Sequence, residues 1–320
     1  MTFFDVFNGD ADGICALHQL RLAEPCPEAQ LVTGVKRDIN LLAKLQGVRE
    51  AQVTVLDISL DSNREELNNL LAADCSVFYA DHHFAGEIPA TPALTAHIDP
   101  SPEVCTSLII DRLLDGRYRP WAVAAAFGDN LHDSARQAAA SLALSEEQLA
   151  TLRELGELLN YNGYGRVVDD LHLSPAELYQ AVHDFEDPFD FCRQSEILAR
   201  LRHGFSDDMA KARGSEPLID GAVGRIYKFP AEPWSRRVAG VFSNEKARER
   251  EELAHALLVD NGDGTFTVSV RAPLSNKKGA DTLCRRFPTG GGRAGAGGIN
   301  LLPDNQIDVF IRDFEEVFAT

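Results

Sequence analysis

Residues 2–13 read TFFDVFNGDADG, and this stretch decides the fold class. Its apolar, aromatic and β-branched run ends abruptly in a polar segment of Asn, Gly and Asp, which is typical of a buried strand that enters a loop. Residues 14–23 then have the composition of a helix. We therefore expect a strand, a loop that carries Asp10 and Asp12, and a helix.

The same alternation continues along the chain. Strand-like runs and helix-like segments take turns at residues 31–33, 39–45, 53–56, 64–71 and 77–79. Strands interleaved with helices predict an α/β fold with a mainly parallel sheet covered on both faces. In such sheets ligands bind beyond the carboxyl ends of the strands. We expect Asp57 and the run Asp81-His82-His83 to join Asp10 and Asp12 at that edge.

The pattern changes twice after residue 102. Helices are predicted at residues 104–114, 121–127, 134–142, 145–160 and 175–185. Strands are then predicted at residues 222–229, 237–242, 254–259 and 265–270, with a hairpin turn at 261–264. A helix at 280–287, a glycine-dense loop at 290–298 and an amphipathic helix at 307–318 follow. This predicts an N-terminal domain at 1–190 with a helical insert, a helical linker at 191–216 and a smaller α/β domain at 217–320.

Charge is distributed unevenly over the 320 residues. Residues 1–200 carry 14 Lys and Arg against 32 Asp and Glu, whereas residues 201–320 carry 17 of each. An acidic body does not favour long duplex DNA, whose binding depends on contiguous Lys and Arg. Clustered carboxylates are instead compatible with bound divalent cations, which offset their mutual repulsion.

Neither a membrane span nor a disulfide framework is indicated. No run approaches the ~18 to 20 consecutive apolar residues of a spanning helix, and the residues from Met1 to Asp5 lack a signal-peptide layout. The six cysteines are scattered without a Cys-x-x-Cys pair, so we expect buried thiols. These features predict a cytoplasmic protein.

Acidic and imidazole side chains at the predicted sheet edge form the candidate metal centre. The set is Asp10, Asp12, Asp57, Asp81, His82, His83 and Asp129. Two divalent ions close together need hard oxygen ligands, a bridging carboxylate and commonly a neutral imidazole. Taken singly, an Asp-Gly segment also suits a surface turn, and an aspartate after a strand also suits a helix cap. Their combination favours metal binding.

Four short motifs in this order resemble those of the DHH phosphoesterase superfamily. They are DADG at 10–13, LDIS at 56–59, ADHH at 80–83 and GDN at 128–130. GGGRAGAGG at 290–298 is similar to the substrate-binding signature of the superfamily's DHH-associated C-terminal domain. The resemblance implies a DHH catalytic domain at 1–190 and a DHH-associated domain at 217–320. Superfamily members include RecJ-type exonucleases, hydrolases of short or cyclic nucleotides, and pyrophosphatases.

The resemblance also implies roles at the metal centre. Asp10 would bind the first of two divalent ions, Asp12 the second, and Asp57 would bridge both. His82 and Asp129 would complete the shell of the second ion. Mn²⁺ is the expected metal, with Mg²⁺ as the alternative.

Two further residues are expected at the reacting phosphate. His83 would face the substrate phosphate, and Asp81 would orient the histidine pair. The chain departs from the family at Val6, where many relatives have a histidine four residues before the first motif aspartate. Asn8 or a water could take its place as a ligand of the first ion.

Substrate contacts are expected from both parts of the chain. The candidates are Arg271, Asn276, Gly290, Gly291, Gly292, Arg293 and His132. Consecutive glycines let backbone N–H groups approach a phosphate closely. Arg293 stands where the family's loop usually has a histidine, so it would act as a phosphate clamp rather than as an acid. The alternative for both arginines is a solvent-facing side chain.

A metal-dependent hydrolase is the function that these features predict. We expect a manganese-dependent phosphoesterase acting on a short oligonucleotide, a dinucleotide or a nucleoside bisphosphate. One alternative is a RecJ-like single-strand exonuclease, which predicts an electropositive groove. Another is a non-catalytic nucleotide-binding protein, which Val6 and Arg293 favour. The expected partner is a small phosphorylated nucleotide or a short single-stranded oligonucleotide; no membrane partner is expected, and a homodimer is left open.

Overall fold

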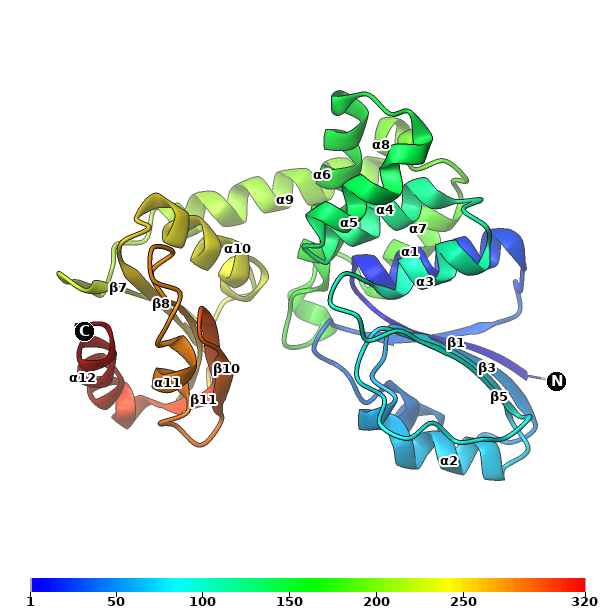
Figure 1. The fold of residues 1–320 in the computed structure, drawn as a ribbon, viewed down its shortest axis with the longest axis horizontal. Coiled ribbons are helices and arrows are strands. Elements are labelled where there is room, and N and C mark those ends of the chain that lie inside the picture. The colour runs from blue at the N-terminus through cyan, green and yellow to red at the C-terminus, as the bar shows by residue number, and fades with distance from the viewer. Residues whose placement is uncertain (1, 320) are drawn as a thin grey trace. The chain divides into compact units, whose positions relative to one another are not determined.

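The computed structural model describes residues 2–319, and the chain divides into two compact units (Figure 1). The first unit is Met1–Gly204 and the second is Phe205–Thr320. Two helices, α8 (Pro188–Gln194) and α9 (Glu196–Arg213), cover most of the predicted linker at 191–216. None of the helices within residues 2–319 combines the length and the apolar character of a membrane span.

A five-stranded parallel sheet forms the centre of the first unit, which confirms the predicted fold class. In spatial order its strands are β2 (Gln30–Gly34), β1 (Thr2–Asn8), β3 (Ala51–Leu56), β4 (Ser76–Asp81) and β5 (Leu94–Ile98). The sequence prediction does not include β5, whose Thr95 and His97 interrupt the apolar pattern. Phe7 pairs with Leu56 and Leu56 with Ala80, so β1, β3 and β4 end level with one another.

Helices cover both faces of this sheet (Figure 1). On one face, α2 (Arg64–Ala72) and the 3-10 helix η1 (Leu41–Leu45) pack on Val6, Val55 and Tyr79. On the other face lie α1 (Ala11–Ala23) and α3 (Thr106–Leu113). A helical group beyond them consists of α4 (Arg119–Gly128), α5 (His132–Ala139), α6 (Glu146–Gly163) and α7 (Pro175–His183). Short 3-10 turns are at Asp61–Asn63, Ala140–Leu142 and Val168–Asp170.

Local signals explain where two of these helices begin. The Ser145 hydroxyl accepts a hydrogen bond from the backbone of Gln148, whose side chain accepts from the backbone of Ser145 in return. Ser174 and Glu177 form the same reciprocal cap at the start of α7. Such capping boxes satisfy two N–H groups that would otherwise lack partners, and so they place the first turn.

A buried histidine lies on α1, inside the first unit. The His18 side chain is fully buried, its Nε2 donates to the carbonyl of Phe185 at 2.8 Å, and its ring meets Trp121 edge-on at 4.6 Å. Burial lowers the pKa of His18 from 6.5 to about 4, because the charged imidazolium loses its hydration. His18 is therefore a neutral part of the core at pH 7.

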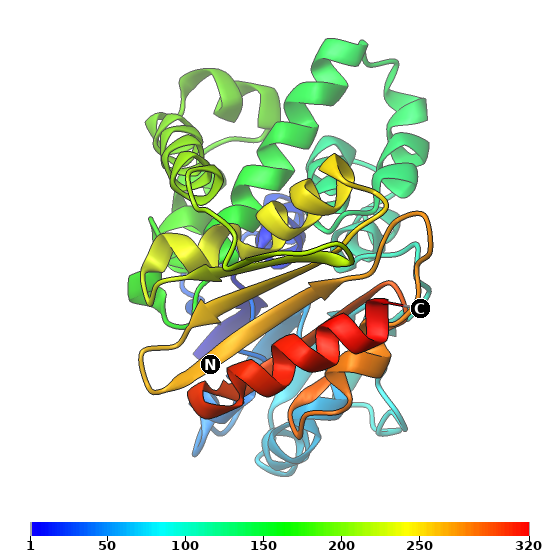
Figure 2. The same cartoon turned by 90° about the vertical axis from the view of Figure 1, so that its left-hand side faces the viewer.

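The second unit is built on a six-stranded mixed sheet (Figure 2). In spatial order its strands are β10 (Gly290–Arg293), β11 (Ala296–Pro303), β9 (Thr265–Arg271), β8 (Ala254–Asp260), β7 (Gly224–Phe229) and β6 (Ile219–Asp220). One face packs on α11 (Ala280–Cys284) and α12 (Ile307–Phe318), with Phe310 and Phe314 in the core. On the other face Phe229 packs against Phe242 of α10 (Pro233–Glu249). A 3-10 turn, Asp304–Gln306, precedes α12.

Two predictions for this unit are wrong. Residues 237–242 form part of α10 rather than a strand, because the apolar Val238 and Phe242 are four residues apart, as on one helix face. Residues 290–298 form the β10–β11 hairpin rather than a loop, with Gly291 paired to Gly298. A Cβ at Gly290 would lie 1.8 Å from a backbone carbonyl oxygen of α11, so this close strand position requires glycine.

Two salt bridges of the second unit differ in burial. Arg237 donates twice to the Asp208 carboxylate, at 2.7 and 3.1 Å, and both side chains are at most 10% exposed. Arg213 donates twice to Glu245, but its own side chain is 57% exposed. The two pairs share their chemistry and differ in solvation, which decides how much each stabilises the fold.

Candidate active site

The first two aspartates face different partners at the N-terminus of α1. Asp10 caps the helix, since its Oδ1 accepts the backbone N–H groups of Asp12 at 3.0 Å and Gly13 at 3.1 Å. The carboxylate of Asp12 accepts the N–H groups of Thr106 and Ser107, each at 2.7 Å. These two donors open α3, so the positive end of a helix stabilises the buried charge of Asp12.

Asp57 is buried among several other carboxylates. It follows β3 with a left-handed φ of 58°, and its N–H donates to the carbonyl of Ala80 at 3.1 Å. The hydroxyl of Thr106 donates to Asp57 Oδ1 at 3.3 Å. Burial, together with the negative charges of Asp12 and Asp10 among others, raises the pKa of Asp57 well above its usual value. A cation beside it would remove this penalty.

His82 connects the carboxylates of the sheet edge. Its Nε2 lies 3.4 Å from Asp57 Oδ1 and 3.7 Å from Asp129 Oδ2. Asp129 comes from the end of α4, and burial, with the charges of Asp12 and Asp10, raises its pKa. The Asp129 side chain is 19% exposed and that of His82 is 21% exposed, so both remain accessible to a ligand.

His83 stands slightly apart and is supported by Asp81. Its Nδ1 lies 2.7 Å from Asp81 Oδ1, and its ring centroid is 4.4 Å from that of His82. The hydrogen bond to Asp81 is the main cause that raises the pKa of His83. Asp81 is fully buried, whereas the His83 side chain is 46% exposed. The ring is therefore oriented from inside the protein and presented to solvent.

The acidic and imidazole side chains of this cluster are close enough together to bind a divalent metal. Asp12, His82 and Asp129 each offer one ligand atom, and these atoms lie within 4.8 Å of one another. Asp57, His82 and His83 form a second such group. Carboxylate oxygens with one or two imidazole nitrogens suit Mn²⁺ and related ions. The structure thus brings all seven predicted metal-centre residues to one edge of the sheet.

Lys36 lies inside this cluster, and the sequence analysis did not select it. Its Nζ donates to Asp10 Oδ2, to Asp129 Oδ1 at 3.2 Å and to Asn160 Oδ1 at 3.0 Å. Burial lowers the pKa of Lys36, but the charge of Asp10 and other acidic neighbours outweighs it, so the pKa is raised well above its usual value. Burial by itself would raise the pKa of Asp10. The charge and the hydrogen bond of Lys36 outweigh this effect, so the pKa of Asp10 is lowered. Lys36 follows β2 by two residues, which is the signal that could have identified it.

The predicted substrate contacts are distributed over both units. His132 starts α5, and its Nε2 lies 3.2 Å from Asn130 Oδ1. In the second unit a groove of about 440 Å³ lies on the glycine hairpin. Its lining includes Arg271, Gly290, Gly291, Gly292 and Asn300. Arg271 Nε donates to Asn244 Oδ1 at 2.7 Å, which holds its guanidinium at the groove.

Two other predicted contacts are placed elsewhere in the second unit. Arg293 ends β10 and is exposed, and Asn276 is exposed in the segment after β9; neither is among the lining residues of the groove. Their roles as substrate contacts remain predictions. The groove itself is formed by backbone, because glycine carries no side chain to fill it.

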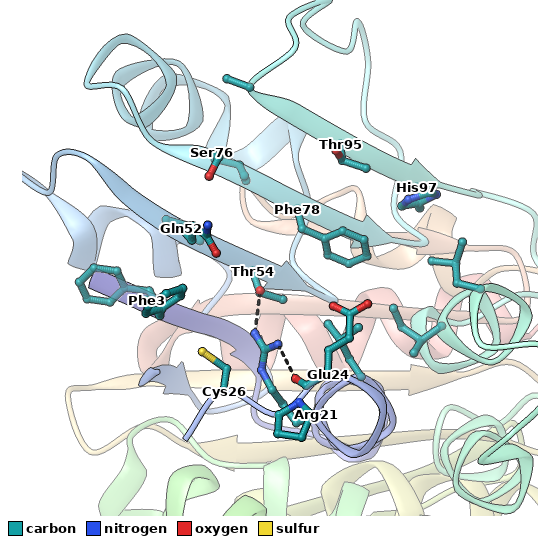
Figure 3. A pocket seen from close by; sticks show the side chains of 18 of the residues that line it. Phe3, Arg21, Glu24, Cys26, Gln52, Thr54, Ser76, Phe78, Thr95 and His97 are labelled. Carbon is teal, nitrogen blue, oxygen red and sulfur yellow. Dashed lines mark hydrogen bonds between the residues drawn. The ribbon is translucent and has the colours of Figure 1, made fainter. Parts of the chain in front are cut away.

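A larger hollow of about 580 Å³ lies over a face of the first sheet, away from the acidic edge (Figure 3). Side chains such as Phe3, Gln52 and Phe78 line it, and none of the predicted site residues does. Arg21 crosses it and donates to the hydroxyl of Thr54 at 2.9 Å and to the carbonyl of Glu24 at 3.2 Å, as the dashed lines show. The candidate metal-binding side chains thus lie outside this hollow.

Solved structures similar to this chain identify its fold. A RecJ exonuclease bound to manganese aligns with a TM-score of 0.64 and 14% identity, over 99% of this chain and 90% of that one. RecJ of Thermus thermophilus with Mn²⁺ gives 0.62 and 16%, over 99% of this chain and 52% of that one. The pGpG-specific phosphodiesterase PggH from Vibrio cholerae gives 0.57 and 14%, over 99% of both chains. No family model and no curated protein sequence matches.

The chain shares its fold with these RecJ and PggH structures, both of which are DHH superfamily members. The resemblance predicted from its short motifs is thereby confirmed at the level of the fold. The RecJ structures with this DHH fold are complexes with Mn²⁺ or Mg²⁺. In this chain the acidic and imidazole cluster offers the donors that either ion accepts.

Proposed function

We propose that this protein is a metal-dependent phosphoesterase that hydrolyses small nucleotides, with Mn²⁺ as the expected ion. The observation that carries the proposal is the group of Asp12, His82 and Asp129, whose ligand atoms lie within 4.8 Å of one another beside the buried Asp57. These carboxylates repel one another, and burial together with this repulsion raises the pKa of Asp57. A divalent cation offsets this repulsion, so the arrangement is better suited to a loaded site than to an empty one.

Different residues of the chain would bind the metal and transfer a proton. When bound, a divalent ion supplies Lewis acidity, which lowers the pKa of a water and polarises phosphoryl oxygens. Asp12, Asp57, His82 and Asp129 would hold it. His83 is oriented by Asp81 through Nδ1, which leaves Nε2 to carry a proton toward a phosphate oxygen or a leaving group. The raised pKa of His83 keeps a larger fraction of it protonated near neutral pH.

The size of the substrate is inferred from charge and from the groove of the second unit. Residues 1–200 carry a large acidic excess and residues 201–320 are balanced, so a long nucleic acid strand finds no basic track in the sequence. The groove of about 440 Å³ suits a single phosphate with part of a nucleoside. Backbone N–H groups of the glycine hairpin and the guanidinium of Arg271 would hold that phosphate. We propose a dinucleotide, a short oligonucleotide or a nucleoside bisphosphate.

A single-strand exonuclease is the second candidate, because a RecJ exonuclease shares the fold over 90% of its own chain. The neighbour PggH has a dinucleotide, pGpG, as its named substrate. A length series separates the two activities. The purified protein is incubated with Mn²⁺ and with pGpG, a nucleoside 3′,5′-bisphosphate, a cyclic dinucleotide or single strands of increasing length, and products are separated by chromatography.

We expect the highest kcat/KM with the shortest substrates and none with Asp57→Asn. A kcat/KM that rises with strand length would replace the proposal with the exonuclease. Nucleotide binding without turnover of any substrate would replace it with a non-catalytic nucleotide-binding protein. Chelation of the metal should abolish all turnover, and activity that survives chelation would contradict metal dependence.

A further inference from the structure

Lys36 makes a complete set of contacts within the acidic cluster. An ammonium group has three donors, and Lys36 Nζ uses them on Asp10, Asp129 and Asn160. Its backbone is also held, since its N–H donates to the carbonyl of Gly163 at 2.9 Å and its carbonyl accepts from Asn8 Nδ2 at 3.2 Å. Such bonding at both ends fixes the ammonium in place.

The contacts of Lys36 come from separate parts of the chain. Asp10 is 26 residues away in sequence, Asp129 is 93 and Asn160 is 124. The Lys36 side chain is 24% exposed, whereas that of Asp10 is only 3% exposed. A surface lysine that forms an ion pair by chance would contact one carboxylate on its own element. Lys36, which follows β2, instead contacts residues at α1, α4 and α6.

The place expected for the first metal ion does not fit such an ion. In the resemblance drawn from the motifs, that ion would be bound by Asp10, by the bridging Asp57 and, in many relatives, by a histidine at position 6, which Asn8 or a water could replace here. Position 6 holds Val6, fully buried in the apolar core of the sheet, and the free oxygen of Asp10 is taken by the Lys36 ammonium. The Lys36 ammonium at Asp10 Oδ2 repels a divalent cation at the same carboxylate, so the two cations compete for this position.

We infer that Lys36 is a built-in cation that replaces one of the two ions expected for this fold, so that the protein holds a single divalent ion through Asp12, Asp57, His82 and Asp129. This inference rests on the proposed phosphoesterase function and specifies its metal content. Lys36 neutralises the side of the cluster formed by Asp10 and Asp129 Oδ1. His82 and Asp129 Oδ2 face the other side, which remains for the metal.

The metal content of the purified protein tests this inference without an activity measurement. The apo protein is dialysed against excess Mn²⁺, bound metal is counted by elemental analysis, and the electron paramagnetic resonance spectrum distinguishes isolated ions from coupled pairs. We expect one Mn²⁺ per chain with the spectrum of an isolated ion. Two ions per chain with a coupled spectrum would overturn the inference. No bound ion at all would instead overturn the proposed function.

Variants of the cluster make the test specific. Lys36→Ala should raise the content from one to two ions, because it frees the oxygens of Asp10, Asp129 and Asn160; a content that stays at one would refute the exclusion by Lys36. Lys36→Met keeps the apolar stem and should give the same result if Lys36→Ala does not fold. The control Lys44→Ala removes a half-exposed lysine that pairs with Asp38 and should leave one ion.

Asp10→Asn tests whether Asp10 pairs with Lys36 or binds the metal ion. Asparagine is also a good helix cap, so α1 should keep its start. If Asp10 pairs with Lys36 and does not bind the metal, this variant should still bind one Mn²⁺. A complete loss of Mn²⁺ binding in Asp10→Asn would place Asp10 among the ligands of the bound ion and would contradict the inference. His82→Ala should lose the ion.

Discussion

Asp12→Asn should destabilise the metal-free protein, although it removes a negative charge from a crowded acidic cluster. Both oxygens of the Asp12 carboxylate accept a backbone N–H, from Thr106 and Ser107, at 2.7 Å. An asparagine offers a single oxygen, so its NH₂ group must face one of these two donors. Asp57→Asn is the matched comparison, because Asp57 accepts only the Thr106 hydroxyl among the described hydrogen bonds, and an amide oxygen can accept it too.

The magnitude follows from the two bonds of Asp12. Losing one charge-assisted hydrogen bond costs about 1.5–3 kcal/mol, and leaving a buried donor without a partner costs about 1–3 kcal/mol. The expected loss for Asp12→Asn is therefore about 2.5–6 kcal/mol. With a denaturant dependence of about 2 kcal/mol per molar urea, the midpoint falls by about 1–3 M. Asp57→Asn should instead raise stability, because burial and the neighbouring like charges raise the pKa of Asp57 and so oppose its ionised form.

The sign of the pH dependence separates the two variants further. The pKa of Asp57 in the folded protein lies above its value of 3.8 in the unfolded chain. The stability that this group contributes is therefore complete below pH 3.8 and is lost as pH rises through the raised pKa. Asparagine does not titrate, so the advantage of Asp57→Asn over the unmodified protein should be larger at pH 8 than at pH 5.

Urea unfolding in the presence of a chelator measures these effects without a metal contribution. The chain has two tryptophans, Trp121 in the first unit and Trp234 in the second, so a Trp234→Phe background assigns the fluorescence change to the first unit. An Asp12→Asn midpoint equal to that of the unmodified protein would refute the role given to the α3 amides. Equal destabilisation by Asp57→Asn would refute the argument from like charges.

Three further predictions concern parts of the molecule outside that contact. Arg237→Met breaks a buried salt bridge and should cost about 3–5 kcal/mol in urea unfolding, whereas Arg213→Met breaks an exposed one and should cost less than about 1 kcal/mol; equal effects would contradict the difference in burial. His18 has a pKa of about 4 in the folded protein against 6.5 in the unfolded chain, so the unfolded chain binds more protons between these values. Stability should fall by about 2 kcal/mol from pH 7.5 to pH 5, and a His18→Gln variant with the same pH profile would refute this cause. Gly291→Ala adds a Cβ that meets nothing within 4 Å, so the fold should persist while KM rises and kcat changes little. An unchanged KM would show that the groove does not bind substrate. Gly290→Ala, whose Cβ would meet a backbone oxygen, should instead lower the thermal midpoint of unfolding.

The polar ends of the strands could be predicted from local sequence. An apolar run that stops at an aspartate marks a strand end, and this pattern precedes Asp10, Asp57 and Asp81. Parallel strands share one carboxyl edge, so three separate motifs imply one site without any knowledge of their distances. The helical period was harder to recognise in α10, where its charged residues obscure the spacing of Val238 and Phe242.

The partners of these aspartates could not be predicted in the same way. Thr106 and Ser107 donate to Asp12 across 94 and 95 residues, and only the packing of α3 beside α1 brings them together. Nothing in the residues next to Asp12 indicates that backbone amides of α3 would also stabilise its charge.

By itself, the sequence determined that acidic and imidazole groups gather at one edge of a parallel sheet, because strand ends are encoded by short, local runs of residues. Only the tertiary structure decided which charge each carboxylate meets. Asp10 meets Lys36, Asp12 meets the amides of α3, and Asp57 meets other acids. Electrostatic pairing depends on distances of a few ångströms between segments far apart in the chain, and those distances exist only after the helices have packed on the sheet.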